Sequence, residues 1–255
     1  MPAELARRKR RESGRLSAPT AVRWWKEKQS HVTSHQRKLL TSLFPVHGIE
    51  LKHGEAVDPR FLFGEDREDL KVLLEIGFGL GDSLLHFAEA RQNTTNCLGI
   101  ELLRSGIAQC LDRIDNLKLT NVKVVRCDAL LLLKQNLVDD SIDECLILFP
   151  DPWPNDERDA QRRVVRAEVL DLLDRKLKPG GSLRIATDVR EYYDYVLALL
   201  GGKSNQFILH ATSISSPGER APHIPLEWPP TKYELRAAEL QHSIYYVEYR
   251  TTKPP

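Results

Sequence analysis

The chain of 255 residues lacks the features that mark membrane, secreted and metal-binding proteins. It has no apolar run near the roughly 18 to 20 residues that a membrane helix requires, and its N-terminus has no apolar stretch of the signal-peptide kind. Its four cysteines are too far apart for C-x-x-C metal chemistry, so we expect reduced thiols and no metal site: Cys97, Cys110, Cys127 and Cys145. These absences predict a cytoplasmic protein that does not associate with membranes.

The charge is unevenly divided along the chain, although the formal net charge is only +1. Residues 1–40 carry eleven Lys and Arg against three acids, and residues 22–26 interleave aromatic with basic side chains. Basic groups bind phosphate and aromatic rings stack on bases, so this segment suits nucleic acid, with a solubilising tail as the alternative. We predict a basic arm over residues 1–40, disordered in part, and one catalytic domain over residues 41–255.

From residue 71 onward, apolar strand patterns alternate with helical ones. Alternating strands and helices predict an α/β fold with a mostly parallel sheet, and two final strands with no helix pattern between them predict an antiparallel edge strand. We therefore expect a seven-stranded sheet, with strands over residues 71–76, 95–100, 122–127, 142–149, 182–187, 207–212 and 243–251.

A glycine turn follows the first of these strands. Gly77, Gly79 and Gly81 stand between an apolar strand and a helical pattern, the arrangement of a nucleotide-binding turn. The spacing is not that of the dinucleotide fingerprint, and Glu75 lies inside the strand, where a phosphate would be repelled. An acid at this position suits a cationic ligand. We therefore predict S-adenosylmethionine, which joins an adenosine to a sulfonium and an ammonium group.

The next two strands also end in acids. Glu101 follows the strand over residues 95–100, where a carboxylate can accept hydrogen bonds from both ribose hydroxyls. Asp128 and Ala129 follow the third strand, at the place expected for the adenine edge. Singly, each acid is as easily a helix N-cap or a solvated carboxylate. Together, at consecutive strand ends, they predict a cofactor pocket.

A proline-rich segment, Phe149-Pro150-Asp151-Pro152-Trp153-Pro154, ends the fourth strand. Prolines fix φ and donate no backbone hydrogen bond, so they hold Asp151 and Trp153 rigidly at the carboxyl end of the strand. Ligands of open α/β sheets bind at that edge. A stiff surface loop is the alternative for this segment taken alone.

Two further segments suggest contacts to RNA. Arg158, Arg162 and Arg166 recur every four residues and would share one face if the segment were helical, with a solvated arginine face as the alternative. Thr231 to Glu234 follows Trp228-Pro229-Pro230 and also has the pattern of a helix N-terminus, with Thr231 as the cap and the acid at the third helical position.

With these motifs in view, the chain resembles the tRNA (guanine-N(7)-)-methyltransferase family over residues 47–250. The Pro-Asp-Pro-Trp strand end and the Thr-Lys-Tyr-Glu segment are marks of that family, whereas the glycine turn fits any class I methyltransferase. The resemblance implies a Rossmann-like class I fold and methyl transfer from S-adenosylmethionine to N(7) of a guanosine in the tRNA variable loop, at position 46. It implies tRNA as partner and, for a bacterial-type enzyme, no required protein partner.

The resemblance also implies roles for individual residues. Asp151 would be catalytic and would bind cofactor, together with Glu75, Gly77, Gly79, Gly81, Glu101, Asp128 and Ala129. The substrate guanosine would meet Asn155, Asp188, Thr231, Lys232, Tyr233 and Glu234. RNA would be bound by Arg158, Arg162, Arg163 and Arg166.

The chain departs from the family after Trp153. The family's basic loop is replaced by a segment in which Asn155 takes the place of a lysine and three acids intrude, which concerns how tRNA is gripped more than the methyl chemistry. Ala237 stands where a glycine is common. Two alternatives follow: a small-molecule or protein methyltransferase, and a non-catalytic RNA-binding paralogue.

Overall fold

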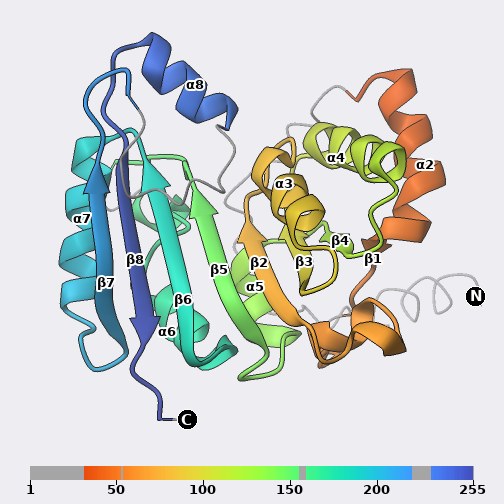
Figure 1. The fold of residues 1–255 in the computed structure, drawn as a ribbon, viewed down its shortest axis with the longest axis horizontal. Coiled ribbons are helices and arrows are strands. Elements are labelled where there is room, and N and C mark those ends of the chain that lie inside the picture. The colour runs from red at the N-terminus through yellow and green to blue at the C-terminus, as the bar shows by residue number, and fades with distance from the viewer. Residues whose placement is uncertain (1–31, 53, 155–158, 220–230, 255) are drawn as a thin grey trace, which may run out of the picture.

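The computed structural model describes residues 32–52, 54–154, 159–219 and 231–254 (Figure 1). Its strands form one eight-stranded sheet in the order β1-β4-β3-β2-β5-β6-β8-β7. The strands are β1 (Gly48–Ile49), β2 (Lys71–Ile76), β3 (Thr95–Ile100), β4 (Val122–Val125), β5 (Ile142–Leu148), β6 (Leu177–Thr187), β7 (Phe207–Ile214) and β8 (Tyr245–Thr251).

The predicted α/β class and parallel sheet are confirmed, with two differences in detail. The sheet has eight strands and not seven, because Gly48 and Ile49 pair in parallel with Val124 and Val125 of β4. The antiparallel strand β8 lies between β6 and β7 and runs opposite to both, so β7 forms the outer edge. A two-residue strand has too little pattern to be recognised in a sequence.

Helices cover both faces of the sheet (Figure 1). An apolar cluster on one face is built with α3 (Asp82–Ala90) and α4 (Arg104–Leu117). The cluster on the other face is built with α5 (Ala129–Gln135), α6 (Ala167–Lys176) and α7 (Arg190–Gly201). In α4 the buried Ile107, Leu111 and Ile114 recur at helical spacing, which is the pattern that marks this helix in the sequence.

Helix α2 (Ser34–His47) precedes the sheet, and a capping box at Thr33 and Gln36 begins it. Its Leu40, Leu43 and Phe44 pack against the α3 and α4 cluster. The predicted boundary between residues 40 and 41 therefore falls inside a helix that packs on the domain. Residues 1–31 of the predicted arm lie outside the described residues.

Helix α8 (Lys232–Glu239) stands above the carboxyl ends of β5 and β6 (Figure 1). Short 3-10 helices are η1 (Pro59–Leu62), η2 (Glu65–Arg67) and η3 (Ala160–Arg162). Within the described ranges, no helix has the length and apolarity needed to cross a bilayer.

Candidate active site

The sheet order brings five acidic residues to one edge. Strands β4, β3, β2, β5 and β6 are consecutive neighbours and run in the same direction, so their carboxyl ends meet at one side of the molecule. The acids at or just after these ends are Asp128, Glu101, Glu75, Asp151 and Asp188, in the order of the strands. Residues far apart in sequence thus form one row of carboxyl groups.

The glycine turn connects β2 to α3 and has the predicted strand-turn-helix form. Gly77, Gly79 and Gly81 all have positive φ, at 78°, 59° and 86°. A Cβ at Gly81 would lie 2.7 Å from Cys110 Sγ, whereas a Cβ at Gly79 would meet nothing within 4 Å. Gly81 therefore packs against the protein's own helices, whereas the space beside Cα of Gly79, where a side chain would lie, is open to a ligand.

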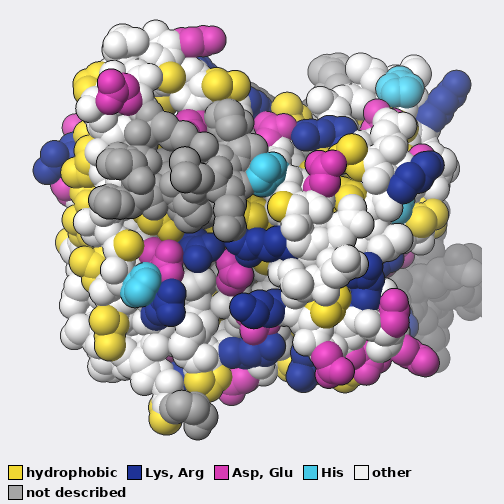
Figure 2. Space-filling view, in the orientation of Figure 1, with side chains coloured by type: hydrophobic (Ala, Val, Ile, Leu, Met, Phe, Trp, Pro, Cys, Tyr) yellow, Lys and Arg dark blue, Asp and Glu magenta, His cyan; other side chains and the backbone are white. Residues whose placement is uncertain are grey.

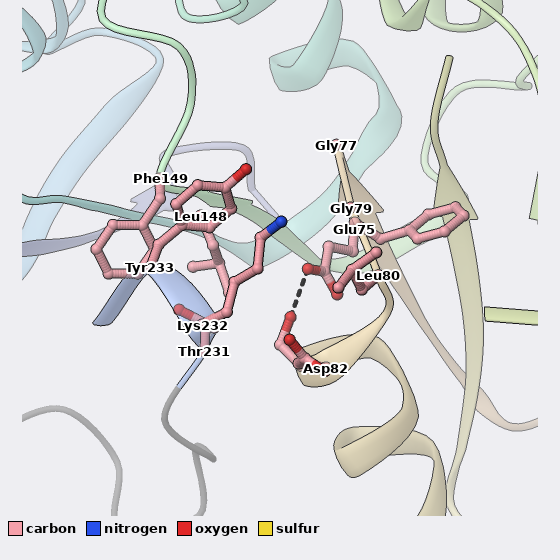
Figure 3. A pocket seen from close by; sticks show the side chains of 12 residues that line it. Glu75, Gly77, Gly79, Leu80, Asp82, Leu148, Phe149, Thr231, Lys232 and Tyr233 are labelled. Carbon is pink, nitrogen blue, oxygen red and sulfur yellow. Dashed lines mark hydrogen bonds between the residues drawn. The ribbon is translucent and has the colours of Figure 1, made fainter. Parts of the chain in front are cut away.

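Glu75 is buried inside β2 with only 3% of its surface exposed. Ser83 Oγ donates a short hydrogen bond to Oε1, and Oε2 has no partner although it is buried (Figure 3). Burial, together with the nearby Asp82 and Glu101, raises the pKa of Glu75 to about 7, and the Ser83 bond opposes that rise. A buried carboxyl oxygen with no partner is an unmet acceptor that a cationic ligand would satisfy.

Glu101 braces the turn as well as facing the site. Its Oε2 accepts from the amide of Gly79 at 2.9 Å, and its Oε1 accepts from the amides of Leu102 and Leu103 at 2.6 and 2.9 Å. Sequence reasoning gave this carboxylate a ribose role only. The structure adds a bond across the turn, joining β2 to β3.

Asp128 caps α5. Its Oδ1 accepts from the amides of Leu130 and Leu131 at 2.9 and 3.3 Å, and Ala129 is the first residue of the helix. The N-cap reading of this acid therefore holds. The second carboxyl oxygen keeps its acceptor capacity at the end of β4.

A cleft of about 320 Å³, open to solvent, lies between the glycine turn and α8. Figure 3 shows Thr231, Lys232, Tyr233 and Phe149 on one side, and the glycine turn with Glu75 on the other. The amino group of Lys232 points from α8 toward the turn (Figure 3). Two motifs more than 150 residues apart in sequence thus face each other across one cleft.

The predicted helix start at Thr231 is confirmed. Thr231 is the N-cap of α8, and its hydroxyl accepts from the amide of Glu234 at 3.1 Å. Both residues are buried, whereas Tyr233 is 43% exposed. The cap fixes the direction in which α8 enters, and so the placing of its first turn in the cleft.

Phe149 connects the end of β5 to the first turn of α8, on one side of the cleft. Its φ is +48°, a left-handed value that is rare for a bulky residue, and its amide donates to Ala186 O at 2.8 Å. The Phe149 ring stacks on Tyr233, with centroids 6.1 Å apart and planes 20° apart. This strained residue immediately precedes Pro150 and Asp151, so it sets the direction of the predicted catalytic loop.

Asp151 is exposed at the end of β5, next to the half-buried Trp153. The Trp153 amide donates to Asp151 O at 2.9 Å, which makes a tight turn around Pro152. The guanidinium of Arg162 lies 3.1 Å from the centre of the Trp153 ring. The proline-rich segment is therefore a constrained loop that leaves the Asp151 side chain accessible.

Asp188 follows β6 on the same edge. Its Oδ2 lies 3.6 Å from Nδ1 of His242, which comes soon after α8. No motif in the sequence indicated this histidine, because it reaches the site only through the pairing of β6 with β8.

The predicted RNA-binding arginines do not form one helical face. Arg162 ends η3 and Arg166 is the N-cap of α6, with a change to extended backbone between them. Arg163 is 5% exposed, so little of its side chain is accessible to RNA in this structure. The other two predicted contacts of this loop, Asn155 and Arg158, lie outside the described residues.

The cysteines show no sign of reactivity. Burial raises the pKa of Cys127 to about 12 and raises the pKa of Cys97, Cys110 and Cys145 further. All four are free thiols, and the described residues contain no group of three or more metal-ligating side chains.

Sequence reasoning missed part of the cleft lining. Ser83 and Asp82 follow the glycine turn directly, and Phe149 begins the proline-rich segment, but none of the three was assigned to the site. Leu148 was predicted only as a strand residue. The missed lining residues are Phe78, Leu80, Asp82, Ser83, Leu148 and Phe149.

Comparison with known proteins shows the family to which the chain belongs. Residues 69–247 match the family model described as "Putative methyltransferase". A tRNA (guanine-N(7)-)-methyltransferase of Serratia proteamaculans (strain 568) is 35% identical over 234 residues, 92% of each chain. One of Shewanella frigidimarina is 32% identical over 88% of this chain and 90% of that protein. The chain belongs to the tRNA (guanine-N(7)-)-methyltransferase family.

The fold comparison agrees with this assignment. A solved structure described as an antibiotic-related methyltransferase has a TM-score of 0.53 at 19% identity and covers 79% of this chain and 100% of its own. The Rossmann-like methyltransferase fold predicted from the sequence is therefore confirmed. In this tRNA (guanine-N(7)-)-methyltransferase family member, the cleft between the glycine turn and α8 is the candidate active site.

Proposed function

We propose that this protein transfers the methyl group of S-adenosylmethionine to N(7) of a guanosine in the variable loop of tRNA, at position 46. The observation that carries the proposal is the cleft in which the glycine turn with Glu75 faces Thr231, Lys232 and Tyr233. A cofactor pocket and a substrate motif meet there at the end of the strand that precedes Asp151. Family membership supports the same reaction.

The cofactor side of the cleft fits S-adenosylmethionine. The unpartnered, buried Oε2 of Glu75 suits a ligand with an ammonium group, and the open space beside Gly79 suits close approach. We assign the ribose hydroxyls to Glu101 and the adenine edge to Asp128 and Ala129. When bound, the cofactor supplies a methyl group on a cationic sulfur.

The substrate requires little acid-base chemistry. Guanine N(7) has an in-plane lone pair and no proton to lose, so no strong general base is needed and positioning dominates the rate. Positive charge moves onto the guanine during transfer. Asp151, held at the end of β5, is placed to stabilise that charge or to accept from guanine N–H groups. At an effective dielectric near 20, a charge pair about 4 Å apart is worth roughly 4 kcal/mol, an upper bound of about a thousandfold in rate.

The opposite wall is assigned to the guanosine. Tyr233 offers a half-exposed ring in that wall. Glu234 and Asp188 do not line the cleft itself, but both are acceptors suited to the N–H donors of guanine. Lys232 places a cation in the cleft, where it would meet a phosphate. We assign Asn155 to the same substrate site on the strength of the motif alone.

The RNA body would be held outside the cleft. Arg162 and Arg166 border the loop that carries Asp151, and Arg158 and the basic segment of residues 1–40 are the remaining cations assigned to phosphate. The matched relatives are bacterial, and we propose a cytoplasmic enzyme that acts on tRNA without a partner subunit.

The test is methyl incorporation by the purified full-length chain from labelled cofactor into three substrates: unmodified tRNA, RNA-free protein extract and RNA-free small-molecule extract. The proposal expects label in tRNA only. Label in an RNA-free fraction and none in tRNA would support the rival methyltransferase class. Cofactor binding without transfer to any fraction would support a non-catalytic paralogue.

A further inference from the structure

Arg163 is a buried arginine next to the active-site loop. Its side chain is almost completely covered, at 5% exposure, and no carboxylate pairs with it among the residues that the structure describes. Its Nη1 is buried without a hydrogen-bond partner. A buried cation is costly to keep in a fold, so its surroundings should show what it does there.

One edge of the guanidinium is bonded to the loop that carries Asp151. Arg163 Nε donates to the carbonyl oxygen of Trp153 at 2.5 Å. The Trp153 amide in turn donates to the carbonyl oxygen of Asp151 at 2.9 Å. Two hydrogen bonds in series therefore connect Arg163 to the backbone of Asp151.

The guanidinium also lies over two aromatic rings of the core. Its central carbon lies 4.1 Å from the centre of the Tyr195 ring and 5.2 Å from that of Tyr192, both on α7. Tyr195 is itself held, because its hydroxyl donates to Val165 O at 3.1 Å. Tyr192 is 1% exposed. The guanidinium thus lies over two aromatic rings and is also bonded through Nε to the loop, a combination that lysine cannot reproduce.

We propose that Arg163 is a positioning residue that anchors the Asp151 loop to α7, and that it does not bind RNA phosphate. The inference rests on the proposed function only in taking Asp151 as the catalytic group. The neighbouring Arg162 provides the contrast, because it lies over the Trp153 ring and its side chain is 35% exposed.

The experiment uses four variants of the full-length chain. Arg163→Met removes the anchor at similar volume, and Arg163→Lys keeps the charge and a donor without the planar stack. Arg162→Met is the exposed neighbour. Arg184→Met is the matched buried control, because Arg184 in β6 forms ion pairs with Glu144 and Glu248. Figure 2 shows that basic and acidic side chains lie side by side on the face of the molecule drawn there.

Three measurements distinguish a residue that positions the Asp151 loop from one that binds RNA phosphate. The first is the single-turnover methyl-transfer rate at saturating tRNA and cofactor. The second is the dependence of tRNA affinity on salt. The third is acrylamide quenching of Trp153 fluorescence in the free protein, in a background in which Trp24, Trp25 and Trp228 are phenylalanine. Thermal melting of each variant is recorded alongside.

For Arg163→Met we expect a rate lower by roughly 10- to 100-fold, the size that misplacing a reacting group by about 1 Å produces. In this variant acrylamide should quench Trp153 fluorescence more strongly, and the salt dependence of tRNA affinity should be unchanged. In Arg163→Lys the transfer rate and the protection of Trp153 from quenching should both be partly recovered. Arg184→Met should melt at a lower temperature and keep both the rate and the Trp153 quenching of the parent. If Arg163→Met does not fold, Arg163→Lys carries the test, with a smaller change in the same direction.

The proposal is overturned if Arg163→Met lowers the salt slope by about 0.7 to 0.9 at an unchanged saturating rate, because that change means that the side chain neutralises one phosphate. It is also overturned if Arg184→Met, at a similar loss of melting temperature, lowers the rate as much as Arg163→Met does, because the rate would then follow stability and not the position of the loop. If the parent protein methylates no tRNA, the proposed function has failed. Trp153 quenching still decides whether Arg163 holds the loop.

Discussion

The backbone amide of Gly79 donates a hydrogen bond to Glu101 Oε2 at 2.9 Å. This bond ties the glycine turn after β2 to the acid that follows β3. The other carboxyl oxygen of Glu101 accepts from two amides of its own loop. The carboxylate of Glu101, the proposed ribose acceptor, is thus held in place by the glycine turn, and the turn is held in turn by Glu101.

Replacement of Glu101 should therefore reduce cofactor affinity in two ways. Glu101→Ala removes the acceptor of the ribose hydroxyls and frees the Gly79 amide, and we expect a loss of about 1 to 3 kcal/mol, as for hydrogen bonds to charged groups. Calorimetry of cofactor binding measures it, with the exposed Glu65→Ala as control. Unchanged affinity in Glu101→Ala would remove this residue from the cofactor site.

Glu75 should make stability depend on pH. Its pKa is about 7 in the fold because of burial, against 4.5 for an ordinary glutamate. The folded state therefore holds a proton that the unfolded chain releases above pH 4.5, so the stabilisation present at low pH is lost as pH rises to 7. The loss is on the order of 3 kcal/mol, at about 1.4 kcal/mol for each unit.

Urea unfolding at pH 5 and pH 8 tests this, with Glu75→Gln beside the parent. The glutamine cannot ionise, so the free energy of unfolding of this variant should not show the fall between pH 5 and pH 8 that Glu75 causes. The exposed Glu65→Gln should show the same fall as the parent. The same variant should bind cofactor more weakly at pH 8, because a cationic ligand favours the ionised carboxylate. Identical pH dependence in Glu75→Gln and parent would mean that Glu75 does not titrate in this range.

Phe149 should be a position where glycine is more stable than alanine. Its φ of +48° costs a residue with a Cβ about 1 kcal/mol, which glycine avoids. We expect Phe149→Gly to be more stable than Phe149→Ala by about that amount, with low transfer activity in both, because each lacks the ring that stacks on Tyr233.

The same pair of substitutions at Ile208, exposed in β7, is the control, and there alanine should be the more stable. Denaturant unfolding gives both differences. If alanine is more stable at both positions, the left-handed backbone of Phe149 carries no cost.

How much of this site is visible in the sequence depends on the kind of interaction. Glu75, Glu101, Asp128 and Asp151 were predictable, because each ends an apolar strand and parallel strands end at one edge. The cap at Thr231 was predictable because capping is local, with its partner three residues away.

Interactions made through tertiary structure were not predictable in the same way. The burial of Arg163 depends on α7, which lies about 30 residues further along, and a run of arginines reads as a solvated face unless that packing is known. The left-handed backbone of Phe149 could not be predicted from the sequence, because such a position is usually occupied by glycine or asparagine. The contact of Asp188 with His242 depends on the order of the strands in the sheet, which the sequence near either residue does not show.

Asp151→Asn should lower turnover far more than tRNA affinity, because its charge is needed as the guanine becomes cationic. We expect a loss of more than about tenfold in the single-turnover rate, below the thousandfold bound given by the charge pair. The affinity for tRNA, measured by filter binding, should stay within about twofold of the parent. Equal losses in rate and affinity would make Asp151 a binding residue only.

The basic N-terminal segment should contribute to tRNA binding. Deleting residues 1–15 should weaken binding and flatten its salt dependence, by roughly 0.7 to 0.9 in log-log slope for each phosphate that the segment neutralises. Cofactor affinity should stay the same, and Asn155→Lys should partly restore tRNA binding in the truncated chain. A salt slope unchanged by the truncation would make the segment a solubilising tail.

The most direct measurement is the position of the methyl group in the product. Unmodified tRNA is incubated with the purified chain and labelled cofactor, and is then cleaved with borohydride and aniline, which break the strand at N(7)-methylguanosine. We predict one cleavage, in the variable loop at position 46, and none in a tRNA in which that guanosine is replaced by adenosine. Label in tRNA that resists this cleavage, or cleavage at another guanosine, would contradict the proposed function.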